Sequence, residues 1–99
     1  MKFFAIIYDL RQPGRNYNGL YDAIKEMAGD GNWQHPMESF WSVAISEYSS
    51  MSVEDMYSIL RQNIDDNDSL FISRMNVDEH QGWMPKSFWA WVKEKRNLL

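Results

Sequence analysis

Few side chains in this 99-residue sequence carry groups suited to catalysis or metal binding. The chain has two histidines, His35 and His80, and no cysteine, so neither a thiolate zinc site nor a histidine-built metal centre is expected. Carboxylates remain as metal ligands, and their oxygens favour hard ions such as Mg²⁺. The expected cofactor is therefore Mg²⁺, or otherwise none.

Two arginines are the candidate phosphate ligands. Arg11 and Arg15 lie in residues 10–17, a stretch that contains no acid. A guanidinium can hold a phosphate through forked hydrogen bonds, which makes a phosphate-binding loop one interpretation. The alternative is that both arginines are ordinary solvated loop charges.

His35 is the candidate proton-transfer residue. It stands between Trp33 and Pro36, where it could act as a general acid or base or stack with Trp33 against a nucleobase. The alternative is a packed, hydrogen-bonded histidine with a structural role.

Composition limits the class of protein. With 44% hydrophobic and 24% charged residues, residues 1–99 are predicted to form a single globular domain. No apolar run approaches the roughly 20 residues of a membrane span, and no signal peptide is recognisable after Met1, so a cytoplasmic protein without membrane contact is expected. The net charge of −4 argues against nucleic-acid binding over the whole surface.

These candidate residues need strands and helices to position them. An apolar run over residues 2–8 predicts a strand buried on both faces that ends near Asp9, and helical spacing follows from Tyr17 to Met27. Two strands are predicted at about 33–37 and 40–46, then a helix of about 12 residues begun by a Ser52 and Asp55 capping pair, and a strand over 69–75. This β-α-β-β-α-β order predicts an α+β, ferredoxin-like sandwich with a four-stranded antiparallel sheet and both helices on one face.

Residues 77–99 form an aromatic-rich loop and an extra carboxy-terminal helix in this prediction, with Pro85 in its first turn. Four strands with two helices leave one sheet face bare, and the chain holds 15 aromatic residues. We therefore expect a homodimer in which sheet faces or carboxy-terminal segments pack together. The alternative is that the last helix folds back over its own sheet. The expected interface residues are Trp41, Trp83, Trp89 and Trp91.

Three segments carry a family resemblance: FAIIYDL at residues 4–10, ESFWSV at 38–43 and DNDSLFI at 66–72. They resemble the small Cas-two-type proteins of CRISPR adaptation, still more their stand-alone SinR-like relatives, and more distantly the VapD toxins. The resemblance covers about residues 2–76. It implies a ferredoxin-like homodimer and, in some members, metal-dependent cleavage of RNA or DNA by the aspartate at the end of the first strand.

By position, that catalytic and metal-binding aspartate is Asp9. One carboxylate binds Mg²⁺ weakly, but two copies near a twofold axis could share an ion. The alternative is that Asp9 tightens the following loop through backbone hydrogen bonds.

The function expected from these residues is that of a Cas-two-like, dimeric binding or accessory protein in a bacterial or phage defence or toxin–antitoxin system. It would act on nucleotides or nucleic acid. The acidic balance and the single candidate carboxylate per chain favour this reading. The alternative is a metal-dependent endonuclease that hydrolyses RNA or DNA with Asp9 at the dimer axis.

Overall fold

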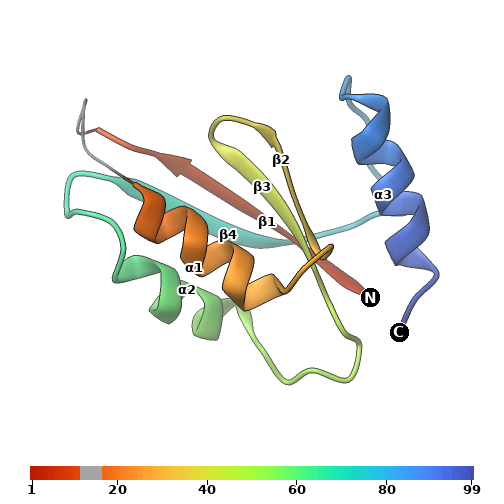
Figure 1. The fold of residues 1–99 in the computed structure, drawn as a ribbon, viewed down its shortest axis with the longest axis horizontal. Helices are drawn as coiled ribbons and strands as arrows, with labels where there is room; N and C mark the ends of the chain where they lie inside the picture. The colour runs from red at the N-terminus through yellow and green to blue at the C-terminus, as the bar shows by residue number, and fades with distance from the viewer. Residues whose placement is uncertain (12–16) are drawn as a thin grey trace.

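The structure is a computed structural model that describes residues 1–11 and 17–99. Its elements follow the predicted order, with a third helix at the end (Figure 1). They are β1 (Lys2–Asp9), α1 (Asn18–Ala28), β2 (Trp33–Met37), β3 (Phe40–Ile45), α2 (Val53–Arg61), β4 (Ser69–Met75) and α3 (Lys86–Arg96). α2 has 9 residues rather than about 12, because the chain leaves the helix at Gln62.

The four strands form one antiparallel sheet in the order β2-β3-β1-β4. β1 lies in the middle, and Phe4 faces Val43 of β3 on one side and Arg74 of β4 on the other. The predicted α+β class with a four-stranded antiparallel sheet is confirmed. None of the helices in the described residues is of the length and apolarity that crossing a membrane requires.

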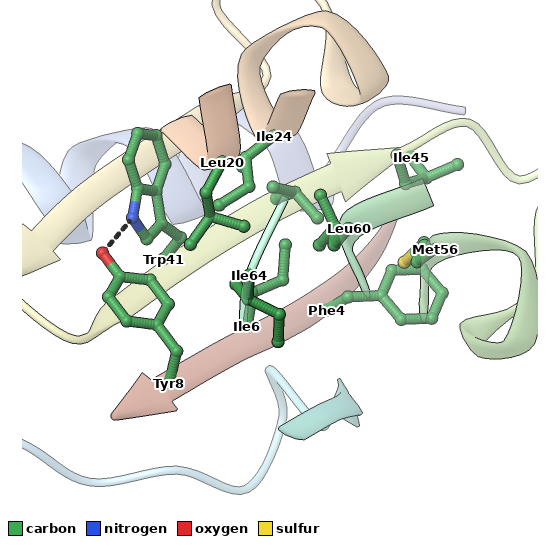
Figure 2. Close-up of a cluster of buried hydrophobic side chains, with 11 residues drawn as sticks. Phe4, Ile6, Tyr8, Leu20, Ile24, Trp41, Ile45, Met56, Leu60 and Ile64 are labelled. Atoms are coloured by element: carbon green, nitrogen blue, oxygen red, sulfur yellow. Dashed lines mark hydrogen bonds between the residues drawn. The ribbon is translucent and has the colours of Figure 1, made fainter. Parts of the chain in front are cut away.

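α1 and α2 lie next to each other on one face of the sheet (Figure 1). Leu20 and Ile24 from α1, and Met56 and Leu60 from α2, are fully buried against that face. Alternate residues of the strands supply the other half of this core, because successive strand side chains point to opposite faces (Figure 2). These strand residues are Phe4, Ile6, Tyr8, Trp41, Val43 and Ile45.

α2 begins with the predicted capping pair. The Ser52 hydroxyl accepts a hydrogen bond from the Asp55 N–H, and the Asp55 carboxylate accepts one from the Ser52 N–H. This reciprocal capping box satisfies two donors that a helix start would otherwise leave unpaired.

α3 packs on the opposite face of the sheet. Phe88, Trp91 and Val92 form a second core with Phe3 and Ala44, in which the Phe3 and Trp91 rings meet edge to face 5.5 Å apart. The Trp91 indole N–H also donates to the Gly31 carbonyl oxygen at 2.7 Å. The last helix therefore folds back over its own sheet, which was the alternative to covering that face by a second copy.

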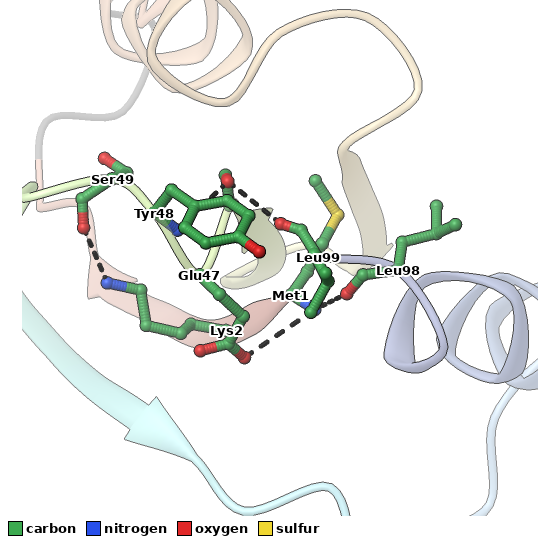
Figure 3. Close-up of polar contacts among 8 residues, drawn as sticks. Met1, Lys2, Glu47, Tyr48, Ser49, Leu98 and Leu99 are labelled. Carbon is green, nitrogen blue, oxygen red and sulfur yellow. Dashed lines mark hydrogen bonds and ion pairs between the residues drawn. The ribbon is translucent and has the colours of Figure 1, made fainter.

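The two ends of the chain hold α3 in place (Figure 3). The Met1 amino group donates to the Leu98 carbonyl oxygen and lies 3.7 Å from a carboxylate oxygen of Glu47. The Leu99 carbonyl oxygen accepts from the Glu47 N–H at 3.1 Å and from the Ser46 hydroxyl at 2.9 Å. The residues after α3 are thus bonded to the start of β1 and the end of β3.

Part of the second face stays uncovered. Phe40, Ile7 and Phe71 form a row across β3, β1 and β4, because Ile7 faces Phe40 on one neighbour and Phe71 on the other. Phe40 is half-buried beside Phe88, but Ile7 is 43% exposed and Phe71 is 62% exposed. The expectation that β1 is buried on both faces is therefore correct only for its first part.

Candidate functional site

Asp9, the predicted catalytic and metal-binding residue, ends β1 in an exposed ion pair. The Arg11 guanidinium contacts one Asp9 carboxylate oxygen through both Nε and Nη2, each at 2.8 Å. Both side chains are about 60% exposed. The structure thus brings together Asp9 and Arg11 as predicted neighbours, whereas Arg15 lies outside the described residues.

Asp68 fixes the chain just after β1. Its carboxylate accepts hydrogen bonds from the Arg11 backbone N–H at 2.8 Å, the Tyr17 hydroxyl at 3.1 Å and the Asp65 N–H at 2.8 Å. Asp68 therefore makes the backbone hydrogen bond at Arg11 that the sequence led us to consider for Asp9. Asp68 ends the segment DDND at residues 65–68, a composition typical of a turn, which indicates local hydrogen bonds only. Its contact with residue 11 depends on the pairing of β1 with β4.

His35, the predicted proton-transfer residue, belongs to a network around the Tyr8 hydroxyl. That hydroxyl donates to the Glu38 carbonyl oxygen at 2.6 Å and accepts from the Trp41 indole N–H at 2.9 Å. His35 Nε2 lies 3.0 Å from the same carbonyl oxygen and 3.4 Å from the Tyr8 hydroxyl. Burial raises the pKa of Tyr8 above its usual range, so its hydroxyl keeps its proton at neutral pH.

The His35 ring stacks on Trp41 rather than pairing with Trp33 to hold a base. The two ring centroids are 4.0 Å apart and nearly parallel. Since Tyr8 gives its proton to the Glu38 carbonyl, the Nε2–H tautomer of His35 satisfies the remaining contact with that oxygen. One ring face of His35 therefore packs on Trp41, and its Nε2 holds the β2–β3 turn at Glu38.

A polar cleft of about 340 Å³ opens beside this network, where β1 ends. α1 contributes the Tyr21 ring, whose centroid is 6.3 Å from that of Tyr8 and 5.5 Å from that of His35. The sequence pointed to neither Tyr21 nor Glu38, because Tyr21 was one member of a helical stripe and Glu38 one residue of a turn. The cleft is lined by Tyr8, Asp9, Leu10, Tyr21, Glu38 and Ser39.

Asp9 is not part of a group of three potential metal ligands in the described residues. Within the described residues, no three histidine, aspartate or glutamate side chains come together as a ligand group. At Asp9, the Arg11 guanidinium binds one of the two carboxylate oxygens, Oδ2. Only a second copy of the chain could add another Asp9 carboxylate.

The four tryptophans predicted at a dimer interface lie in different environments. Trp41 is 1% exposed inside the core under α1, and Trp91 is 6% exposed under α3, so these two pack within their own chain instead of presenting surface to a partner. Trp89 is half-buried and stacks on His80, with ring centroids 5.4 Å apart. Trp83 is completely exposed and is the only one of the four wholly open to a partner.

Comparison of this chain with protein-family models, curated proteins and solved structures gave no match.

Proposed function

We propose that this chain is a Cas-two-like, ferredoxin-like binding or accessory protein that works as a cytoplasmic homodimer and binds a nucleotide or nucleic acid. It would serve a bacterial or phage defence or toxin–antitoxin system. The observation that carries the proposal is the polar cleft at the end of β1, with the exposed Arg11 guanidinium beside it. The sheet order β2-β3-β1-β4 with α1 and α2 on one face supports the ferredoxin-like assignment.

The chemistry of the cleft suits a nucleotide. Arg11 is bonded to Asp9 and largely exposed, so a phosphate can approach its outward N–H groups without entering the acidic cleft. The Tyr21 ring is half-buried at the cleft wall, where a nucleobase could stack on it. Phosphate and base would then occupy the outside and the inside of one small site.

The uncovered part of the sheet supports pairing of two copies. Ile7 and Phe71 lie opposite each other on β1 and β4 and remain exposed on the face that α3 only partly covers. Asp9 follows Ile7 by two residues and so lies on the same face. A second copy placed there would bury these apolar side chains.

Binding is tested by thermal shift and calorimetry with nucleoside monophosphates and short RNA, on the parent and on Arg11→Gln. We expect stabilisation of the parent, and an affinity roughly tenfold weaker in the variant, because one charged phosphate contact is lost. Arg96→Gln is the matched control. Arg96 also pairs with an aspartate, Asp78, but it lies on α3 and not at the cleft. If no ligand stabilises the parent, or if both variants weaken binding equally, the site is misassigned.

A metal-dependent endonuclease is the second candidate function. The observation in its favour is that Asp9 lies on the uncovered sheet face, where pairing would bring two copies of it towards one axis. The test is cleavage of labelled RNA and DNA with Mg²⁺ or with a chelator, by the parent and by Asp9→Asn. Cleavage by the parent alone supports this candidate, and a dimer inert on every substrate removes it.

A further inference from the structure

The cleft lining contains two carboxylates, those of Asp9 and Glu38, and only one of them has a partner among the described residues. Asp9 is paired with Arg11, whereas the Glu38 carboxylate makes no hydrogen bond or ion pair with any residue that the structure describes. Glu38 is exposed in the β2–β3 turn and lines the cleft together with Tyr8 and Tyr21. The cleft therefore holds one charged acceptor whose hydrogen-bonding capacity is unused within the described chain.

Three hydrogen bonds hold the backbone at Glu38 and Ser39. Its carbonyl oxygen accepts from the Tyr8 hydroxyl at 2.6 Å and bonds His35 Nε2 at 3.0 Å, and the next carbonyl, that of Ser39, accepts from the Tyr8 N–H at 3.1 Å. The buried Trp41 indole in turn fixes the Tyr8 hydroxyl. A turn anchored in this way fixes the backbone from which the Glu38 side chain projects, so a ligand that binds there does not have to order a loop.

An ionised carboxylate only accepts hydrogen bonds, and its two oxygens suit a ligand with two adjacent N–H donors. Among the nucleobases, guanine presents such a pair on its Watson–Crick edge, at N1 and at the N2 amino group. Adenine presents one amino group beside a ring nitrogen that only accepts, and two acceptors facing each other are unfavourable.

We propose that the cleft is a guanine-selective site in which Glu38 reads the N1–H and N2–H donors, the base stacks on Tyr21, and Arg11 holds the phosphate outside. This inference rests on the proposed nucleotide binding and specifies its ligand. It also explains why an acidic cleft can serve a nucleotide, because only the neutral base enters it.

The test is calorimetric titration of the full chain with guanosine monophosphate and adenosine monophosphate. We expect a preference for the guanine nucleotide of roughly tenfold or more, the discrimination typical of a paired hydrogen-bond contact. In Glu38→Gln an acceptor and a donor replace two acceptors, so the preference should vanish or shift to adenine. The backbone contacts of Glu38 do not involve its side chain, so the variant should fold like the parent, as circular dichroism can check.

Glu94→Gln provides the matched control, since it makes the same charge change at an exposed position of α3, which covers the other sheet face. It should keep the guanine preference. Equal binding of both nucleotides by the parent overturns the guanine inference but leaves the proposed function standing. Binding of short RNA but of neither nucleotide overturns the guanine inference alone, and binding of neither nucleotide nor short RNA overturns both. Spermidine tests the alternative that the cleft binds amines. If spermidine binds through Glu38 but displaces guanosine monophosphate no more readily than it displaces adenosine monophosphate, the cleft is an amine site and the guanine inference is wrong.

Discussion

The indole N–H of Trp41 donates to the hydroxyl of Tyr8 across two neighbouring strands, at 2.9 Å and inside the core under α1 (Figure 2). Both side chains are almost fully buried, and the Trp41 N–H has this hydroxyl as its acceptor. The same hydroxyl donates to the turn that carries Glu38. A single hydroxyl thus joins the hydrophobic core to the rim of the candidate cleft.

Tyr8→Phe is predicted to destabilise the fold. It leaves the buried Trp41 N–H without an acceptor and removes a donor from the Glu38 carbonyl, which together should lower the free energy of unfolding by about 1–3 kcal/mol. Urea denaturation followed by tryptophan fluorescence measures the change. Tyr48→Phe is the control because Tyr48 is 80% exposed, and equal midpoints for both variants would contradict the role given to the Tyr8 hydroxyl.

Phe71→Ser is predicted to separate a dimer without unfolding the chain. Phe71 is 62% exposed beside Ile7, so its replacement removes apolar contact area from a partner and little from the protomer. Light scattering coupled to gel filtration should show a dimeric parent and a monomeric variant, while Tyr48→Ser stays dimeric. A parent that elutes as a monomer at every concentration would refute the pairing.

The capping box of α2 should make the stability of the fold depend on pH in the acidic range. Two hydrogen bonds lower the pKa of Asp55 below its usual value. The larger effect comes from the Ser52 backbone N–H and the smaller one from the Ser52 side chain. A carboxyl with a lowered pKa contributes stability that is fully present above its ordinary pKa of about 3.9 and is lost as the pH falls through the lower, folded value.

Asp55→Asn should therefore have a lower urea midpoint than the parent at pH 7, and this difference should shrink as the pH falls below about 3.9. Glu54→Gln, the adjacent exposed acid in the first turn of the same helix, controls for the general effect of charge near a helix start. A pH-independent difference between Asp55→Asn and the parent would show that the charge of the cap is unimportant.

Trp91→Phe should lower the stability of the fold, whereas Trp83→Phe should leave it unchanged. Trp91 loses its hydrogen bond to the Gly31 carbonyl and part of its packing on Phe3, at a cost of about 1–3 kcal/mol of unfolding free energy. Trp83 is fully exposed, and its replacement should leave the unfolding curve unchanged. A loss of stability in Trp83→Phe would mean that the residue is covered in solution, for example by a second copy.

Local patterns were sufficient to predict the helices and strands. The apolar run of β1, the three-and-four spacing of Leu20 and Ile24, and the Ser52–Asp55 pair each act over a few residues, and the structure has each element where the pattern placed it. The outcome for α3 could not be read this way. The apolar face of α3 is compatible in sequence with packing on its own sheet or on a second copy, and its packing on Phe3 and Ala44 is seen only in three dimensions.

The candidate site was only half predictable for a related reason. Asp9 and Arg11 are near each other in sequence, and the structure pairs them. Glu38 and Tyr21 reach the same cleft from a turn and a helix that are separate in sequence, and Asp68 reaches Arg11 from 57 residues away. Such contacts follow from strand order and register, which no short motif encodes.

The central place of β1 has a consequence for how the chain is made. Of the strands that the structure describes, β1 is synthesised before both of its neighbours, and because β4 ends only at Met75, the edge of β1 that pairs with β4 stays unpaired long after β3 has been made. Its sequence, KFFAIIYD, is apolar, rich in β-forming residues and free of proline, as are segments that aggregate when exposed. Long-range pairing of this kind is slow to form. Nascent chains stalled before β4 would therefore be the form of this protein most in need of a chaperone.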